Sequence, residues 1–482
     1  MNRIFNEILL AGEVHNSACW SETYMEHVWE RAKQLHCNAI LAPIYWEQIE
    51  QEEGNYDFSL LDRMLQDAKE HGLKLVLLWF GAWKNGLSTY APEWVKLNQG
   101  RFPRTKDATG KLSKTLSMFG SELQEVETRT LVEIMRHIRE KDKQDRTVVA
   151  MQLENELGVL ETDRDYSLPA EAMYAELSDK DNTDTRLSRE EFFMVLHYAR
   201  YVNALAKAAK QVWDIPMYTN AWQKENAGCK PGDYPSGGPI IEAIDLWKKE
   251  APCLDFVSPD IYDFDFRRFA DAYSRKDNIL FIPETRRDHW AVANLYLAVG
   301  KYKAYCYAPF GLESVGENYS FITGMAHTNP SDKNVSSPQI KVYLSESYKM
   351  MQALMPYILK AYEENRIYGF CQVEGQMGED LSVGKYRMHI KYYHPVEDGS
   401  EWMPGAGLVI ELADGELLFA GYGYRAELSL ANGDKTLDYL SLEKGNFDQN
   451  QEWHCDMHLN GDEQHIRMEE LPTVLRARYY EF

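Results

Sequence analysis

The segment VVAMQLENELG (residues 148–158) has the pattern of a buried strand with acidic side chains at its end. Its first residues are apolar or β-branched, which predicts a strand covered on both faces, as strands of parallel sheets are. Glu156 stands at the end of the apolar run, where burying a charge costs free energy unless the charge has a partner. The segment therefore predicts a parallel strand that presents a functional carboxylate at its C-terminal end.

Seven further apolar segments of similar length occur along the chain, and stretches with helical periodicity separate them. This alternation is typical of parallel βα units. Eight such strands favour an α/β fold of the closed (β/α)8 TIM barrel type over an open doubly wound sheet. The expected strands are 8–15, 39–46, 74–83, 148–158, 215–222, 255–262, 279–286 and 304–314. The expected helices include 25–36, 58–72, 127–142, 189–212 and 339–365.

From about residue 366 the pattern changes to alternating apolar and polar residues with little helical periodicity. Turn signals recur at Asp398-Gly399, Asp414-Gly415, Asn432-Gly433 and Asn460-Gly461. We therefore expect a catalytic barrel over residues 1–365 and a small antiparallel β domain over residues 366–482. The polar stretch 159–188 and the Gly/Pro-rich stretch 225–240 are expected to be long loops of the barrel.

The net charge of −23, from 75 acidic and 52 basic residues, argues against nucleic acid and anionic membranes as partners. No apolar run is long enough for a transmembrane helix, and the N-terminus lacks a signal-peptide pattern. The seven cysteines are scattered without CxxC pairs, which favours reduced core thiols in a cytoplasmic protein. Twelve Trp and 30 Tyr suit a protein that binds sugars, because aromatic faces cover the apolar surface of a pyranose.

Two carboxylates at strand ends carry the chemical prediction. Glu156 ends the fourth strand and Glu284 ends the seventh, three βα units apart, so both can reach the barrel axis. Retaining glycoside hydrolysis needs two carboxyl groups about 5–5.5 Å apart, one as nucleophile and one as acid/base. The other strand ends also carry polar or aromatic residues: His15, Tyr45-Trp46-Glu47, Trp83, Asn155, Asn220, Asp260 and Glu313.

The segment VVAMQLENELG resembles the acid/base motif of glycoside hydrolase family 35, the β-galactosidases, within the clan of retaining barrel glycosidases. The resemblance implies that Glu156 is the acid/base, that Glu284 in IPETR is the nucleophile and that Asn155 hydrogen-bonds the sugar 2-hydroxyl. It covers the whole barrel and, more loosely, the tail. Residues 45–65 are similar to the family's early pattern at Trp46, Glu50, Gly54, Tyr56, Phe58 and Asp62.

The resemblance implies an exo-acting enzyme that needs no cofactor or metal and removes terminal galactose from small oligosaccharides. Plant cell-wall fragments imported by a bacterium are one source of such substrates. A barrel with an appended β domain often dimerises, so a homodimer is an open option.

The sequence also departs from the family pattern. Glu47 and Ile49 replace an Asn and a His, and the usual third-strand Ala-Glu-Trp is absent; in its place stand Trp79, Phe80 and Trp83-Lys84-Asn85. As a hypothesis, Trp46, Trp83 and Asn85 shape the subsite for the terminal sugar, and Tyr262 lies near the nucleophile. His15 is a further candidate for substrate binding. Packing inside the barrel for the aromatic residues and a loop turn for Asn85 are equal alternatives. An α-L-arabinopyranosidase, a β-glucosidase and a catalytically silent carbohydrate-binding protein stay open as alternatives.

Three further signals receive structural interpretations. Glu154 is expected to be a buried ion-pair partner, with Arg286 as a candidate cation. HCDMH (454–458) offers two His and one Cys but lacks paired zinc spacing, so a surface strand is favoured over a metal site. GEDLSVGKY (378–386) has the wrong spacing for a phosphate loop.

Overall fold

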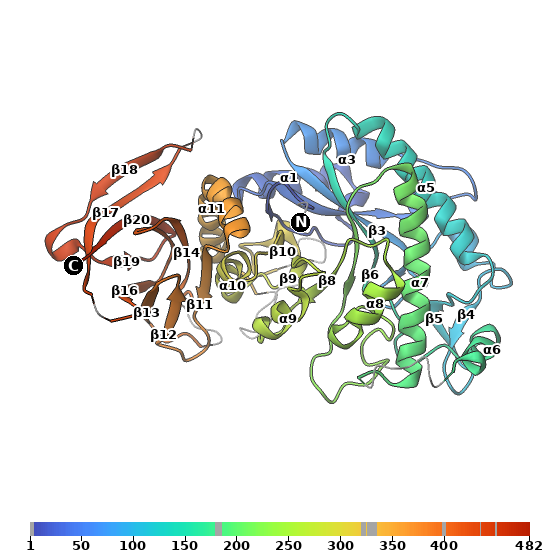
Figure 1. Ribbon diagram of the computed structural model, residues 1–482. Helices are drawn as coiled ribbons and strands as arrows, with labels where there is room; N and C mark the ends of the chain where they lie inside the picture. Colours follow the sequence, from blue (N-terminus) through green and yellow to red (C-terminus); the bar gives the residue numbers. More distant parts are fainter. Residues whose placement is uncertain are drawn as a thin grey trace. The chain divides into compact units, whose positions relative to one another are not determined.

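The computed structural model describes residues 4–178, 186–319, 324, 335–397, 402–433, 435–448 and 451–482 (Figure 1). The chain divides into two compact units. The first is mainly Gly12–Trp29 and Asn38–Glu284, and the second is Phe5–Ala11, Glu30–Cys37 and Thr285–Phe482. The expected division into domains at residues 365 and 366 stays a prediction.

Eight strands form one sheet in the order β1-β10-β9-β8-β7-β6-β3-β2, with parallel pairing. A parallel bridge between Glu13 and Leu41 joins the two ends of this order. The nearly closed barrel confirms the predicted fold class and all eight expected strands. The strands are β1 (Leu9–Leu10), β2 (Ala39–Tyr45), β3 (Lys74–Lys84), β6 (Val148–Asn155), β7 (Met217–Ala221), β8 (Phe256–Ile261), β9 (Phe281–Thr285) and β10 (Cys306–Pro309).

The expected helices are present, and their ends follow local capping rules. The Ser188 hydroxyl accepts a hydrogen bond from the Glu191 N–H (3.1 Å) at the start of α7. Helix α11 has Pro at its first position and ends at Asn365, whose φ of 54° is left-handed. The expected helices are α1 (Glu22–Gln34), α3 (Ser59–Glu70), α5 (Leu123–Asp142), α7 (Arg189–Val212) and α11 (Pro338–Glu364).

Most of the remaining helices in the described part of the chain are short. The expected loop 159–188 contains one of them, α6, and residues 179–185 of that loop lie outside the described residues. Helices α5 and α7 lie side by side on the outside of the first unit (Figure 1). These other helices are α2 (Trp46–Ile49), α4 (Glu93–Lys96), α6 (Leu168–Glu176), α8 (Ile244–Glu250), α9 (Phe266–Tyr273) and α10 (His289–Gly300). A small hairpin is formed by β4 (Arg104–Lys106) and β5 (Leu112–Leu116).

The C-terminal part is antiparallel β structure, as predicted. A six-stranded sheet, β11-β14-β15-β20-β17-β18, and a four-stranded sheet, β12-β13-β16-β19, share an apolar core that includes Met388 and Phe419. Asp414-Gly415 joins β14 to β15 as expected, with Gly415 at a φ of 74°, whereas Asp398-Gly399 lies outside the described residues. The strands are β11 (Ile367–Cys371), β12 (Gly378–Val383), β13 (Tyr386–Tyr392), β14 (Ala406–Ala413), β15 (Glu416–Tyr422), β16 (Tyr424–Leu430), β17 (Leu437–Phe447), β18 (Trp453–His458), β19 (Ile466–Met468) and β20 (Thr473–Glu481).

Within the second unit, helix α10 packs directly on β11 and β14. Every residue from Trp290 to Gly300 in this helix is buried. Gly300 and Gly369 allow the closest approach, because a Cβ on Gly300 would lie 2.5 Å from the Gly369 Cα. The C-terminal strands therefore cover a helix that the sequence assigns to the barrel.

The structure bears on two expectations about the whole chain, the absence of transmembrane helices and the burial of the cysteines. In the described part of the chain, no helix has the length and apolar character needed to cross a bilayer. All seven cysteines are free thiols, but Cys455 is exposed, so they are not all core residues.

Candidate active site

Three carboxyl groups converge where parallel strands end. Glu156 follows β6, Asp260 lies in β8 and Glu284 lies in β9, and one oxygen of each falls within 4.8 Å of the other two. All three are buried, with exposed fractions of 6%, 3% and 5%. The structure therefore brings together the two carboxylates that the sequence singled out and adds a third.

Among the described residues, the ammonium group of Lys84 faces this cluster. The Lys84 Nζ, at the end of β3, lies 4.0 Å from a Glu284 oxygen and 4.8 Å from the Phe80 ring centroid. Burial alone would lower the pKa of Lys84, but the carboxylates around it, Glu284 first, outweigh burial and raise that pKa. Lys84 therefore stays charged. Its ammonium supplies the positive charge that a metal ion held by the three carboxyl groups would otherwise supply.

Glu13 is a fourth carboxyl group, which the sequence analysis missed. It is fully buried, and neither of its oxygens has a hydrogen-bond partner within the described residues. Burial first, and then the charge of Glu284, raise its pKa well above the ordinary value. The missed signal was period-two alternation, because in the expected strand 8–15 Glu13 would share a face with His15, which was selected.

The charge balance at this end of the barrel is strongly acidic. Four carboxyl groups share one lysine, so burial, followed by repulsion from Glu284, also raises the pKa of Asp260 well above its ordinary value. A hydrogen bond with Glu156 contributes to the same shift. The raised pKa values of Glu13 and Asp260 favour protonated carboxyl groups in this cluster, and a site that must donate a proton needs one.

Asn220 links residues of the acidic cluster through hydrogen bonds. Its side-chain oxygen accepts a hydrogen bond from the Glu156 N–H (2.9 Å), and its amide donates to Asp260 (2.8 Å) and to the Asn155 side-chain oxygen (3.1 Å). The Asn155 side-chain amide is buried and has no acceptor in the described part of the chain. That amide is the donor that the sequence analysis assigned to a sugar hydroxyl.

The backbone around Glu156 is strained. Glu156 and Glu154 have φ values of 45° and 59°, a left-handed region that non-glycine residues rarely adopt. Asn85 is also left-handed, with a φ of 52°, and its N–H donates to the Asn155 carbonyl (3.0 Å). Strain of this kind concentrates at functional sites, where surrounding contacts hold an unusual conformation.

Tyr262 is placed beside the predicted nucleophile, as the hypothesis required. Its hydroxyl donates a hydrogen bond to the second Glu284 oxygen (2.8 Å). Burial and then the Glu284 charge raise the pKa of Tyr262 well above its ordinary value. The phenol therefore remains a neutral donor to that carboxylate.

The two predicted tryptophans lie in packed surroundings. Trp46 is fully buried between Trp79 and Trp94 and donates its indole N–H to Glu50 (2.9 Å). Trp83 is fully buried, and its indole N–H is taken by the Leu116 carbonyl (3.0 Å). This burial favours packing over direct contact with a sugar.

The neighbours of these tryptophans differ in their relation to the site. Strand alternation directs Lys84, not its neighbour Trp83, to the carboxylates. His15 is buried in the loop after β1. Its role as a sugar contact stays a prediction, as do those of Trp46, Trp83 and Asn85.

The expected ion pair of Glu154 with Arg286 is wrong. The Glu154 carboxyl accepts hydrogen bonds from the Ala82 N–H (3.1 Å) and the Trp83 N–H (2.8 Å). It lies beside Glu127, whose oxygen also receives the Ala82 N–H (3.4 Å). The Arg286 guanidinium instead pairs with Asp288 (2.7 Å). Glu154 thus belongs to a buried carboxyl pair.

The other two signals are confirmed as strands. Residues 378–386 form the hairpin of β12 and β13, which excludes a phosphate loop. HCDMH lies on the exposed strand β18. Ligand-type side chains do gather there in two exposed groups, Glu443-Cys455-His458 and Asp448-Glu452-His454, and such acidic surface groups are common without a metal.

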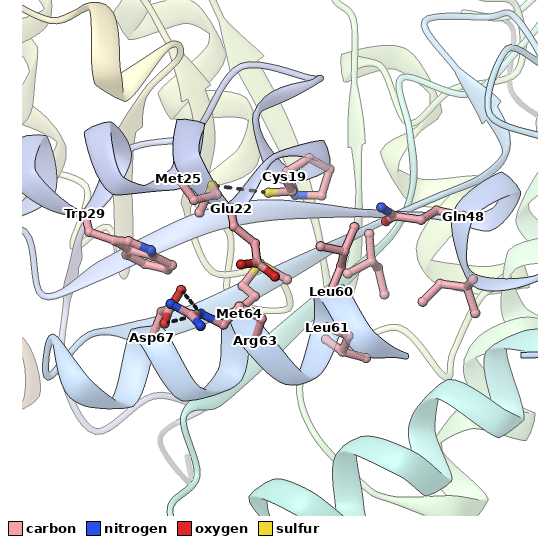
Figure 2. A pocket seen from close by; sticks show the side chains of 13 residues that line it. Cys19, Glu22, Met25, Trp29, Gln48, Leu60, Leu61, Arg63, Met64 and Asp67 are labelled. Atoms are coloured by element: carbon pink, nitrogen blue, oxygen red, sulfur yellow. Dashed lines mark hydrogen bonds and ion pairs between the residues drawn. The ribbon is translucent and has the colours of Figure 1, made fainter. Parts of the chain in front are cut away.

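A small cavity lies away from the carboxylates. Figure 2 shows its lining by side chains of α1, β2 and α3, among them Trp29 and Met64, with Arg63 paired to Asp67 (2.8 Å). Its volume is about 20 Å³, which is room for about one water molecule. It is therefore too small to hold a sugar.

Comparisons with known proteins agree with the barrel fold and with a β-galactosidase-like glycoside hydrolase. Residues 15–190 match the family model of glycoside hydrolase family 42, described as β-galactosidase, and residues 344–469 match a domain of unknown function. No curated protein matches the chain significantly. The matched family is 42, so the resemblance to family 35 is not supported at that level, whereas the resemblance to β-galactosidases of the barrel clan is.

Solved structures show the same fold at low identity. The β-galactosidase of Rahnella sp. R3 aligns with a TM-score of 0.50 and 16% identity over 73% of this chain and 57% of its own. The β-galactosidase of the psychrophilic Marinomonas ef1 aligns with a TM-score of 0.50 and 11% identity over 74% of this chain and 60% of its own. The chain therefore spans less than two thirds of these β-galactosidases.

Proposed function

We propose that this protein is a retaining exo-β-galactosidase in which Glu284 is the nucleophile and Glu156 the acid/base. The observation that carries the proposal is the placement of one oxygen from each within 4.8 Å. Retaining enzymes hold their carboxyl groups about 5–5.5 Å apart, whereas inverting enzymes hold them about 6.5–9.5 Å apart to admit a water molecule. The match of residues 15–190 supports a glycoside hydrolase of the β-galactosidase type, and family 42 is the assignment we favour.

The surroundings of the two carboxyls favour this division of roles. Glu284 faces the Lys84 ammonium and accepts the Tyr262 hydrogen bond, both of which stabilise a negative charge. Glu156 lies instead beside Asp260, whose pKa is raised by burial, by neighbouring carboxylates and by its hydrogen bond with Glu156. Glu284, which faces the Lys84 ammonium, is therefore the nucleophile. Glu156, which lies next to Asp260 with its raised pKa, is the proton donor.

The reaction then proceeds in two displacements. Glu284 attacks the anomeric carbon and forms a glycosyl ester while Glu156 transfers its proton to the departing glycosidic oxygen. Glu156 next removes a proton from water, the water oxygen bonds to the anomeric carbon, and Glu284 leaves as a carboxylate. The free Asn155 amide would bind the sugar 2-hydroxyl, a contact that strengthens in the transition state.

The decisive experiment is trapping with a 2-fluoro-β-galactoside, followed by mass spectrometry of the digested protein. We expect one adduct, on the peptide containing Glu284, and none in Glu284→Gln. Glu156→Gln should retain trapping by a 2-fluoro-galactosyl fluoride, whose leaving group needs no proton. An adduct on any other peptide would refute the site.

A panel of nitrophenyl glycosides tests the sugar. If an α-L-arabinopyranoside or a β-glucoside is hydrolysed faster than the β-galactoside, that sugar replaces galactose as the proposed substrate. If sugars bind equally well to wild type, Glu156→Gln and Glu284→Gln and none is hydrolysed, the protein is a carbohydrate-binding protein and not an enzyme. The small oligosaccharide substrate, the cytoplasmic location, the bacterial source and the homodimer belong to the same proposal.

A further inference from the structure

An exposed tryptophan ends a row of aromatic rings that begins at the candidate active site. Phe80 lies under the Lys84 ammonium, and its ring centroid is 5.1 Å from that of Tyr90. Tyr90 stacks on Tyr45 at 5.3 Å with an interplanar angle of 16°. Tyr45 in turn stacks on Trp20 at 5.3 Å and 15°. All of these residues belong to the first compact unit, so the row is a feature of one body.

The row crosses the face of the barrel where active sites are built. Tyr45 ends β2, Lys84 ends β3, and Trp20 lies in a 3-10 turn (Ala18–Trp20) of the loop that follows β1. The C-terminal ends of parallel barrel strands and the loops after them form one mouth. The row therefore leads from Glu284, through Lys84, to the rim.

Trp20 differs from the other rings in being open to solvent. Its exposed fraction is 44%, whereas Tyr45 and Phe80 are fully buried. Tyr45 is its ring partner within the described residues and covers one face of the indole, so the remaining exposed surface is the opposite face and edge. Exposing a flat apolar face of this size costs solvation free energy, and a ligand that covers it recovers that cost.

The loop that carries Trp20 is tied to the rings beneath it. The Tyr45 hydroxyl donates to the Asn16 carbonyl (2.7 Å), and Tyr90 has a side-chain hydrogen bond with Ser17. These contacts fix the position of the indole before any ligand arrives. A rigid, preorganised ring binds with little loss of conformational entropy.

From this arrangement we propose that Trp20 is a stacking platform for an aglycone sugar, the part of the substrate beyond the scissile bond. The inference rests on the proposed function. An exo-acting enzyme holds the terminal sugar at the deep, buried carboxylates, so whatever extends toward the rim is the aglycone. The flat face fits the apolar C–H face of a pyranose, and a long oligosaccharide gains more from it than a short substrate.

The test compares two substrates in wild type and Trp20→Ala. One is β-galactosyl fluoride, whose leaving group cannot reach Trp20; the other is a β-linked galactotriose, assayed separately as the 1,3-, 1,4- and 1,6-linked forms. In Trp20→Ala we expect kcat/KM for the best galactotriose to fall about tenfold relative to the fluoride, mainly through KM. Tenfold corresponds to about 1.4 kcal/mol. Trp20→Tyr should restore most of the wild-type ratio of kcat/KM for the galactotriose to kcat/KM for the fluoride.

A matched control is available in the second unit. Trp402 is 50% exposed and also stacks on a neighbouring ring, that of His394, at 3.8 Å. Trp402→Ala should leave the substrate ratio unchanged, and turnover of the fluoride reports whether each variant folds. An unchanged ratio in Trp20→Ala would overturn only the role proposed for Trp20. If wild type hydrolyses neither substrate, both the proposed function and the role of Trp20 are overturned.

Discussion

Lys84 is the residue on which the electrostatics of the candidate site depend. Its ammonium is the cation facing Glu13, Glu156, Asp260 and Glu284, and all four act to raise its pKa against the effect of burial. A buried cation among carboxyls lowers the cost of ionising one of them. Lys84 thus stabilises negative charge on the carboxylate that it faces, whereas burial raises the pKa values of Glu13 and Asp260.

We predict that Lys84→Met reduces kcat/KM by about two to three orders of magnitude, the range of losses seen when one electrostatic group is removed from a catalytic site. Without the ammonium the carboxyls bind protons more tightly, so the acidic limb of the pH–rate profile should move to higher pH. Stopped assays from pH 4 to pH 9 measure both effects. Lys96→Met, which removes an ion pair with Glu47 that is about 30% exposed, is the control. An unshifted acidic limb would contradict the role given to Lys84.

Glu13 poses a different problem, because a buried carboxyl without a hydrogen-bond partner destabilises a protein. Burial raises the pKa of Glu13 well above its ordinary value and so favours the neutral form, which Glu13→Gln imitates. We expect Glu13→Gln to stay within several-fold of wild-type activity. Glu13→Leu should lose about two orders of magnitude, since a sugar hydroxyl would then lack its partner.

The same pair of variants makes a prediction about stability. Glu13→Leu removes an unsatisfied polar group and should raise the unfolding free energy by about 1–3 kcal/mol, measured by chemical denaturation. A gain in stability with a loss of activity is the signature of a functional buried polar group. Equal losses of activity in both variants would instead indicate that Glu13 works as a charged carboxylate.

At the scale of elements, strands β3 and β6 are joined by a pair of buried acids. Glu154 accepts the N–H groups of Ala82 and Trp83, and Glu127 on α5 accepts the Trp79 indole N–H (2.8 Å) and the Tyr201 hydroxyl (2.7 Å). Burial first, and then Glu127, raise the pKa of Glu154 well above its ordinary value. The raised pKa of Glu154 favours a proton on its carboxyl group, and the pair positions the end of β6, which Glu156 follows.

This pair predicts a pH dependence of stability with a defined sign. A carboxyl whose folded pKa is raised binds more protons in the folded state, so stability is fully present below its unfolded pKa of about 4.5. It is lost as pH rises toward the folded pKa, by up to about 1.4 kcal/mol per pH unit for one proton. Glu154→Gln should flatten that decline in thermal melts from pH 5 to pH 9. Glu125→Gln, at an exposed site on α5, the helix that carries Glu127, should not change it. Parallel declines in wild type and both variants would contradict the assignment.

At the scale of the whole molecule, the barrel sequence and the C-terminal strands depend on each other in the second unit. Helix α10 is buried from Trp290 to Gly300, with β11 and β14 packed against it. A chain that ends at residue 365 would expose that apolar helix, so we expect it to be insoluble or to lack a cooperative thermal transition. The full-length chain is the control. A soluble, cooperatively melting fragment with galactosidase activity would show instead that residues 1–365 form an independent domain.

The elements were predictable because local patterns encode them. Glu156 directly follows the apolar strand β6, and Glu284 is the second-last residue of β9. Their placement three βα units apart followed from counting repeats, so the sequence singled out both residues. The family was placed less well, because barrel glycosidases share these strand ends and differ in the segments that recognise the sugar. Trp46 and Trp83 were selected as sugar contacts by residue type, whereas their burial depends on neighbours distant in the sequence.

The sequence by itself determined the order of strands and helices, the antiparallel tail and two of the carboxylates, because hydrophobic periodicity and chain order are local properties. Only the tertiary structure decided which charges meet. Glu13, Lys84 and Asp260 are separated by scores of residues and are brought together by closure of the barrel. The energy of a buried charge depends on its neighbours in space, and those neighbours exist only once the ring of strands has formed.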